Sequence, residues 1–135
     1  MKKRIALFQI FLVVSLTLFF SESVFAQDKK LVIRIAKLKI DPVQLASYKV
    51  ALKEEMEISV RIEPGVLSLY ALADKSDPAS ITIFEIYANE DAYNAHRETA
   101  HFKKYKTGTK DMVKSLELLD TDPIALDAKK DLSLN

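Results

Sequence analysis

Two successive segments of the chain carry apolar side chains at both odd and even positions. They are residues 66–73 (VLSLYALA) and residues 80–88 (SITIFEIYA), and the turn-forming residues 74–79 separate them. Their β-branched and aromatic content predicts a pair of strands, and a strand that is apolar on both faces must be covered on both faces. The rest of the chain offers enough helix for one face. We therefore expect a sheet with helices on one side and a second copy of the protein on the other.

The remaining segments predict one α+β domain with an antiparallel sheet. A first strand is expected at residues 31–40, and an Asp-Pro pair at residues 41–42 gives the following helix an N-cap carboxylate and a proline at its first position. This helix ends at the Glu-Pro-Gly turn of residues 63–65, because proline cannot continue it. Two shorter helices then precede a last strand at residues 115–120.

The first 26 residues have the features of an export signal. A basic cluster at residues 2–4 precedes an uncharged, mostly apolar run at residues 5–20, and the small residues Val24 and Ala26 follow. Together these features are typical of a secretory signal peptide. The apolar run is shorter than the roughly 20 residues that span a bilayer. We expect cleavage after Ala26 and an exported protein, periplasmic or secreted, with no membrane association after signal removal. An uncleaved signal kept as an anchor is the alternative.

Charge and cysteine content exclude several classes of partner and site. The chain has 20 basic residues, 19 acidic residues and no cysteine. The signal segment holds three of the basic residues and one of the acidic residues, so the remaining domain has a formal charge of −1. A nearly neutral domain with scattered Lys and Arg lacks the basic surface that nucleic acids or membranes require. The absence of cysteine excludes disulfides and thiolate metal sites.

The two histidines, His96 and His101, lie near the junction of the two short helices. Their spacing is not the i,i+4 pair typical of two metal ligands on one helix, and the nearby acids are Glu90, Asp91 and Glu98. We therefore predict no metal site. Two interpretations of the histidines stay open. They bridge helix ends on a polar surface, or they act in a pocket.

Glu85 places a carboxylate on an otherwise apolar strand face, which it shares with Tyr87. A buried carboxylate is costly unless it is paired or used in chemistry. One interpretation is an ion pair with Lys37 or Arg34 of the first strand. The other is a pocket acid or base beside Tyr70 and a histidine, which suits proton abstraction from a phenolic or enolic substrate.

Four short motifs follow one another along the chain: EPGVL at residues 63–67, FEIY at 84–87, DAYNAH at 91–96 and TAHF at 99–102. In order and spacing they resemble the antibiotic biosynthesis monooxygenase family, most closely its small quinol monooxygenase-like members. The resemblance covers about residues 31–123. We therefore expect a family domain at residues 27–123, between the signal peptide at residues 1–26 and a C-terminal tail at residues 124–135.

The resemblance implies a ferredoxin-like α+β fold in which two subunits join their sheets into a dimeric α/β barrel. It also implies a monooxygenase that acts on small electron-rich aromatics, such as quinols or anthrones, without metal or flavin. In that chemistry the substrate is deprotonated and its carbanion reacts with O2 directly, in a cavity that supplies a base and hydrogen bonds to the oxyanion. On this chain the implied catalytic residues are His101, His96 and Glu85, and the implied substrate-binding residues are Tyr70, Tyr87 and Phe102.

Two departures separate the chain from parts of this family. It has no tryptophan, and its first strand has no asparagine. The haem-degrading branch uses both residue types, so haem breakdown is disfavoured, and aromatic-oxygenating members often use one of them. Another branch isomerises a small sugar-derived signal and has a histidine-rich helix segment similar to residues 96–102. A small-molecule isomerase and a non-catalytic dimeric binding module therefore stay open as alternatives.

Overall fold

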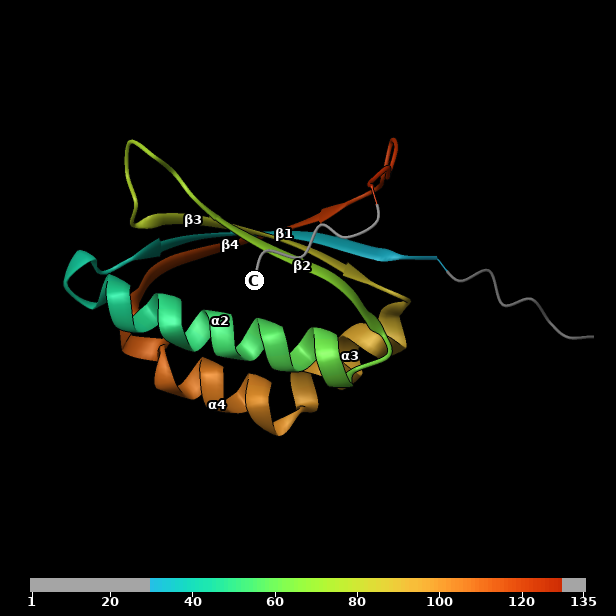
Figure 1. Cartoon of the computed structure of the whole chain (residues 1–135), viewed down its shortest axis with the longest axis horizontal. Coiled ribbons are helices and arrows are strands. Elements are labelled where there is room, and N and C mark those ends of the chain that lie inside the picture. The colour runs from blue at the N-terminus through green and yellow to red at the C-terminus, as the bar shows by residue number, and fades with distance from the viewer. Residues whose placement is uncertain (1–29, 130–135) are drawn as a thin grey trace, which may run out of the picture.

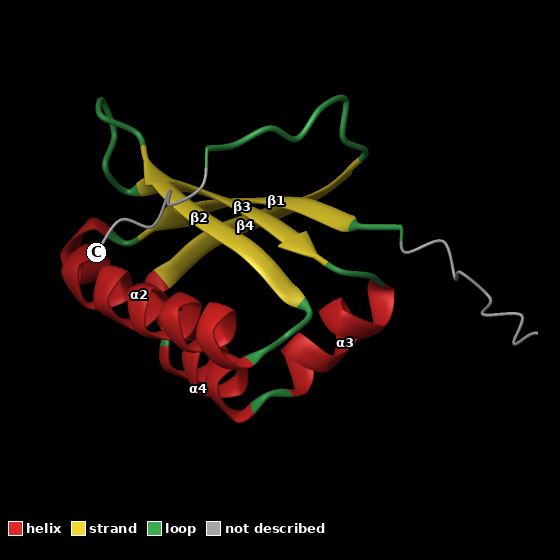
Figure 2. Cartoon of the chain, turned by 45° about the vertical axis from the view of Figure 1, so that its right-hand side comes forward, coloured by secondary structure: helices red, strands yellow, loops and turns green. Residues whose placement is uncertain are grey.

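The computed structural model describes residues 30–129, in which a four-stranded antiparallel sheet lies over three α-helices (Figure 1). The strands are β1 (Val32–Ile40), β2 (Val66–Ala73), β3 (Ser80–Tyr87) and β4 (Val113–Thr121). The helical elements are α2 (Leu45–Ile62), α3 (Glu90–Glu98), α4 (Ala100–Gly108) and the 3-10 turns η2 (Pro42–Gln44) and η3 (Lys110–Met112). Figure 2 shows all three α-helices on one side of the sheet, which confirms the predicted ferredoxin-like α+β fold. The expected signal peptide lies outside the described residues.

The strand order β2-β3-β1-β4 places β1 and β3 at the centre of the sheet. In the register of these strands, Arg34 of β1 lies opposite Glu85 of β3 on one side and opposite Asp120 of β4 on the other. Four residues further along β1, on the same face, Leu38 lies opposite Ile81 of β3 and Leu116 of β4. The helix-facing surface of the sheet therefore changes from charged to apolar along the strands.

Local sequence signals position the long helix and its end. The Asp41 carboxylate accepts a hydrogen bond from the backbone N–H of Val43 at 3.0 Å, so the capped Asp-Pro start is confirmed, although its first turn is the 3-10 helix η2. At the other end α2 stops at Glu63. A Cβ atom added to Gly65 would lie 2.4 Å from the Cβ of Ala92 in α3. Glycine is therefore needed where this turn packs against α3.

The two short helices meet at a single residue. Asn89 accepts from the backbone N–H of Ala92 at 2.8 Å and caps α3. Thr99 ends α3 and, through its hydroxyl oxygen, accepts from the backbone N–H of Phe102 at 3.3 Å, which caps α4. Because the helices turn at Thr99, His96 in the last turn of α3 and His101 in the first turn of α4 lie close to each other.

The main core lies between α2 and the sheet. It consists of buried apolar residues from β1, α2 and β3: Ala36, Leu38, Ile40, Tyr48, Leu52, Ile81 and Ile83. The expected α2 stripe of Leu45, Tyr48, Leu52 and Met56 packs in this cluster. The Tyr48 hydroxyl also lies 2.7 Å from the Tyr105 hydroxyl, which links α2 to α4 through a hydrogen bond.

No helix within residues 30–129 covers the other face of the sheet (Figure 1). Side chains alternate along a strand, so this face carries Ile35, Phe84 and Tyr70, with Leu72 beside them. Tyr70 is 37% exposed and Leu72 is 64% exposed. The predicted two-faced apolar character of β2 and β3 is therefore present. Among the helices of this described part, none is both long and apolar enough to cross a membrane.

Candidate active site

A cavity of about 410 Å³ lies between the helices and the helix-facing side of the sheet. Half of its lining is apolar: Ala36, Leu38, Leu52, Met56, Leu69, Ile83, Phe102, Leu116 and Leu118. Its polar lining residues are Arg34, Glu55, Glu85, Tyr87, Tyr93, His96, Arg97, Tyr105 and Lys106. A concave space of this size, with a few polar groups among apolar ones, is the usual form of a small-molecule site.

One carboxylate holds both histidines on the helical side of the cavity. Glu63, at the end of α2, has its Oε1 atom 3.0 Å from Nδ1 of His96 and 2.5 Å from Nε2 of His101. His96 is 3% exposed, and the side chains of Glu63 and His101 are each 13% exposed. The helix turn at Thr99 and the helix end at Glu63 thus bring three distant titratable groups together.

Glu63 also fixes which nitrogen of each ring carries a proton. Burial acts to raise the pKa of the Glu63 carboxyl, but hydrogen bonds from His96 and His101 outweigh burial and hold the pKa below its ordinary value. The ionised carboxylate can only accept hydrogen bonds, so Nδ1 of His96 and Nε2 of His101 are the donors. In neutral His96 this leaves Nε2 with a free lone pair.

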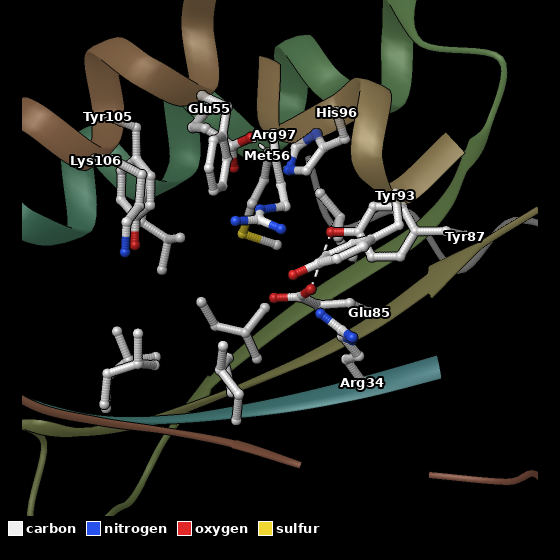
Figure 3. A pocket seen from close by; sticks show the side chains of 18 residues that line it. Arg34, Glu55, Met56, Glu85, Tyr87, Tyr93, His96, Arg97, Tyr105 and Lys106 are labelled. Atoms are coloured by element: carbon white, nitrogen blue, oxygen red, sulfur yellow. Dashed lines mark hydrogen bonds and ion pairs between the residues drawn. The ribbon is translucent and has the colours of Figure 1, made fainter. Parts of the chain in front are cut away.

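The free nitrogen of His96 lies beside a second carboxyl, Glu55 of α2. His96 Nε2 is 3.6 Å from Glu55 Oε1, and the Ser59 hydroxyl donates to the same oxygen at 2.6 Å. Burial raises the pKa of Glu55, so this carboxyl keeps its proton to higher pH than an exposed glutamate. Figure 3 shows Glu55 and His96 side by side on the helical wall above the cavity.

The sheet side of the cavity carries a third carboxyl, Glu85 of β3. Its Oε2 atom accepts a hydrogen bond from the Tyr87 hydroxyl at 2.9 Å, drawn as a dashed line in Figure 3. Burial raises the pKa of Glu85. Glu85 therefore keeps its proton to higher pH than an exposed glutamate does.

The expected ion pair between Glu85 and the first strand does not form among residues 30–129. Arg34 lies opposite Glu85 in the sheet, but it forms its ion pair with Asp120, whose Oδ1 atom is 2.7 Å from Arg34 Nε. The Arg34 Nε atom makes no hydrogen bond in this contact. The Arg34 guanidinium carbon also lies 3.9 Å from the ring centroid of Tyr93. Lys37 is paired with Glu117 at 4.0 Å.

A sequence model of the family described as "Antibiotic biosynthesis monooxygenase" matches residues 31–108 of the chain. The chain belongs to this family. No curated protein matches the chain.

Solved structures that are similar to this chain have the same fold. A candidate antibiotic biosynthesis monooxygenase from Bacteroides thetaiotaomicron is 52% identical, with a TM-score of 0.73, and the match covers 74% of this chain and 97% of that chain. A candidate monooxygenase from Lactobacillus acidophilus is 31% identical, with a TM-score of 0.65, covering 67% of this chain and 43% of that chain. A protein from Nitrosomonas europaea, at 22% identity and a TM-score of 0.66, covers 71% of this chain and 92% of that chain and shows the fold alone.

Four of the six residues that the family resemblance implied lie around the cavity of this family member. His96, Glu85, Tyr87 and Phe102 line the cavity, and the rings of His96 and Phe102 are 4.6 Å apart. His101 contacts Glu63 behind His96 and is not a lining residue. The expected placement of Tyr70 beside Glu85 is wrong. It stacks on Phe84 at 6.5 Å on the opposite face of the sheet.

Several polar groups of the site were missed by reasoning from the sequence. Glu55 and Glu63 are the most important, because they contact His96 directly or at close range. Glu55 belongs to the buried stripe of α2, in which Tyr48, Leu52, Glu55 and Ser59 follow one another at steps of four, three and four residues, and this periodicity was the available signal. Glu63 lies within the EPG motif, whose glutamate was interpreted only as part of a helix end.

Proposed function

We propose that this protein is a cofactor-independent monooxygenase of small electron-rich aromatics of the quinol or anthrone type. The observation that carries this proposal is the His96 side chain. Its Nδ1 atom is hydrogen-bonded to Glu63 at 3.0 Å, and its Nε2 atom is free on the wall of a cavity of about 410 Å³. A buried imidazole oriented by a carboxylate is a suitable general base.

The proposed reaction begins when His96 Nε2 removes a proton from the activated carbon or hydroxyl of the substrate. The resulting carbanion reacts with O2 and becomes a peroxide. Loss of water from the peroxide leaves a new carbonyl group, so one oxygen atom enters the substrate and the other leaves as water with two substrate hydrogens. Glu85 lies on the opposite wall and burial raises its pKa, and in its protonated form it donates a hydrogen bond to the substrate oxygen on which negative charge develops.

A small-molecule isomerase on the same fold is the second candidate. The observation that favours it is the 3.6 Å separation between His96 Nε2 and the buried carboxyl of Glu55. A base and a protonated acid on one wall suit the transfer of a proton between neighbouring substrate atoms. A non-catalytic binding module, the third candidate, uses the cavity without either proton transfer.

We also propose that the protein is exported and acts as a homodimer. The basic cluster and apolar run of residues 2–20 support export. The partly exposed apolar face that includes Tyr70 and Leu72 supports pairing of two sheets, because a second copy would cover it.

The experiment is oxygen uptake by the purified protein with a panel of reduced quinols and anthrones, in the presence of a chelator. We expect enzyme-dependent uptake, and a rate about 100-fold or more lower for His96→Ala, because general base catalysis contributes on this scale. Product formation without oxygen would favour the isomerase instead. Ligand binding without turnover, unchanged in His96→Ala, would favour the binding module.

A further inference from the structure

We propose that Glu55, His96 and His101 form a binding site for one divalent transition-metal ion. One ligand atom from each of these three residues lies within 4.8 Å of the other two. Glu55 comes from α2, more than 40 positions before the histidines, so the short-range spacing that argued against a metal did not include it. Two imidazoles and one carboxylate form a ligand set that transition metals such as iron and zinc accept in proteins.

The separations between the ligand atoms are close to those of a coordination sphere. Metal–ligand bonds of about 2.0–2.1 Å place neighbouring tetrahedral ligand atoms about 3.4 Å apart. His96 Nε2 and Glu55 Oε1 are already 3.6 Å apart. The ligand atom of His101 lies within 4.8 Å of the other two, so the His101 side chain would move closer to them when the metal binds.

Glu63 supplies the outer contacts that such a site needs. A histidine that binds a metal donates its other ring N–H to a carboxylate in most metal sites, which fixes the tautomer and the ring orientation. Glu63 accepts from one nitrogen of each imidazole, at 3.0 Å for His96 and 2.5 Å for His101. The other nitrogen of each ring is therefore left as a ligand.

Burial and charge also favour a cation at this position. The side chains of Glu55 and His96 are 6% and 3% exposed. When Glu55 is ionised its buried carboxylate needs a positive partner, and among residues 30–129 neither Lys nor Arg forms an ion pair with it. Because Glu55 and His96 line the cavity, the remaining coordination positions of the metal would face it.

The inference goes beyond the proposed oxygenation and stands or falls separately from it. A metal ion on His96 Nε2 would occupy the lone pair that the proposed base uses. Metal binding and metal-free oxygenation therefore compete for the same nitrogen atom, and Zn²⁺ should inhibit oxygen uptake if both proposals hold.

The test is calorimetric titration of Zn²⁺ into the purified protein after treatment with EDTA and dialysis. We expect one Zn²⁺ per chain, loss of this binding in Glu55→Gln and His101→Asn, and affinity about 10- to 100-fold lower in Glu63→Gln, the usual effect of losing an outer-shell partner. The matched control is Glu57→Gln, an exposed carboxylate of α2 paired with Lys53 at 3.5 Å, which should bind Zn²⁺ like the wild type.

Circular dichroism of each variant separates loss of a ligand from loss of the fold. The visible spectrum of the Co²⁺-substituted protein gives a second readout, because its bands should change in Glu55→Gln and stay the same in Glu57→Gln. Absence of stoichiometric Zn²⁺ binding by the wild type would overturn the proposal, and so would a folded Glu55→Gln variant that binds Zn²⁺ with unchanged affinity.

Discussion

The pKa of a glutamate is shifted in opposite directions on the helical side and on the sheet side of the cavity. On the helical side, burial acts to raise the pKa of Glu63, but two imidazole donors outweigh it and the net pKa is lowered. On the sheet side Glu85 accepts one hydrogen bond, from Tyr87, and burial raises its pKa. Both carboxyls are largely shielded from water. The number and kind of donors that face each carboxyl, and not burial alone, decide whether its pKa is lowered or raised.

The difference gives the two sides different chemical roles. An ionised carboxylate behind His96 fixes the tautomer and the orientation of the imidazole. A protonated carboxyl at Glu85 can donate a hydrogen bond to developing negative charge. One residue type therefore supports the base on one wall and supplies the proton donor on the other.

The variant with the largest expected effect is Glu63→Gln, which removes the negative charge on the helical side of the cavity. A glutamine has no charge, so the charge-assisted hydrogen bonds that both histidines donate to Glu63 Oε1 become weaker neutral ones, and its amide nitrogen is a donor where the second carboxylate oxygen was an acceptor. We expect kcat for oxygen uptake to fall by about 100-fold while the protein stays folded. Nitrogen-15 NMR of the imidazoles should show a changed tautomer in at least one ring. An unchanged kcat, equal to that of the Glu57→Gln control, would contradict the role given to Glu63.

The sheet side is tested by the pH dependence of stability in Glu85→Gln. In the unfolded chain a glutamate ionises near its ordinary pKa of about 4.3, whereas folded Glu85 keeps its proton to higher pH. The folded state therefore binds more protons between these two pKa values, and the wild-type free energy of unfolding falls as the pH rises through that window. Removing this group should make this fall smaller, by about 1.4 kcal/mol for each unit by which folding raises the pKa of Glu85.

Urea denaturation of both proteins at a series of pH values from 4 to 8 measures this effect. The informative quantity is the difference between the two free energies of unfolding, because other titrating groups contribute equally to both. Glutamine can still accept from the Tyr87 hydroxyl, so the local hydrogen bond is conserved in the variant. Parallel pH profiles for the two proteins would show that Glu85 is not held protonated.

The smallest expected effect is that of Tyr70→Phe. Tyr70 lies on the opposite face of the sheet, so removing its hydroxyl should change the oxygen-uptake rate by less than about twofold, as for other surface changes. Tyr87→Phe is the matched variant on the cavity side and should lower the rate severalfold, because it removes the donor to Glu85. Equal effects of the two variants would contradict the role given to Tyr87 as the hydrogen-bond donor to Glu85.

Most of the fold could be predicted from the sequence, because each element carries its own local signal. The bounds of β2 matched the expectation, since β-branched and aromatic residues end at turn formers on both sides. The last strand is longer than expected and starts at Val113. Its residues Val113 and Lys114 carried no turn or alternation signal of their own, and pairing with β1 extends the strand.

The candidate site was harder to predict because it depends on register and on contacts between distant segments. Glu85 pairs with Leu69, so Tyr70 falls on the other face, and a shift of one residue in strand register reverses the face of every side chain. Glu55 stands among Glu54 and Glu57, which are solvent-exposed, and only its place on the buried stripe of α2 distinguishes it from them. The contact of Glu63 with two histidines depends on the fold of a turn more than 30 positions away.

The tight approach of Gly65 to Ala92 has a consequence for sequence change in this protein. The Cβ of Ala92 already occupies the space next to Gly65, and an added methyl group there would be 2.4 Å from it. Any enlargement at residue 65 requires a smaller residue at position 92. We expect these two positions to covary among relatives, so that an alanine at one accompanies a glycine at the other and the spacing between Glu63 and His96 is inherited as a unit.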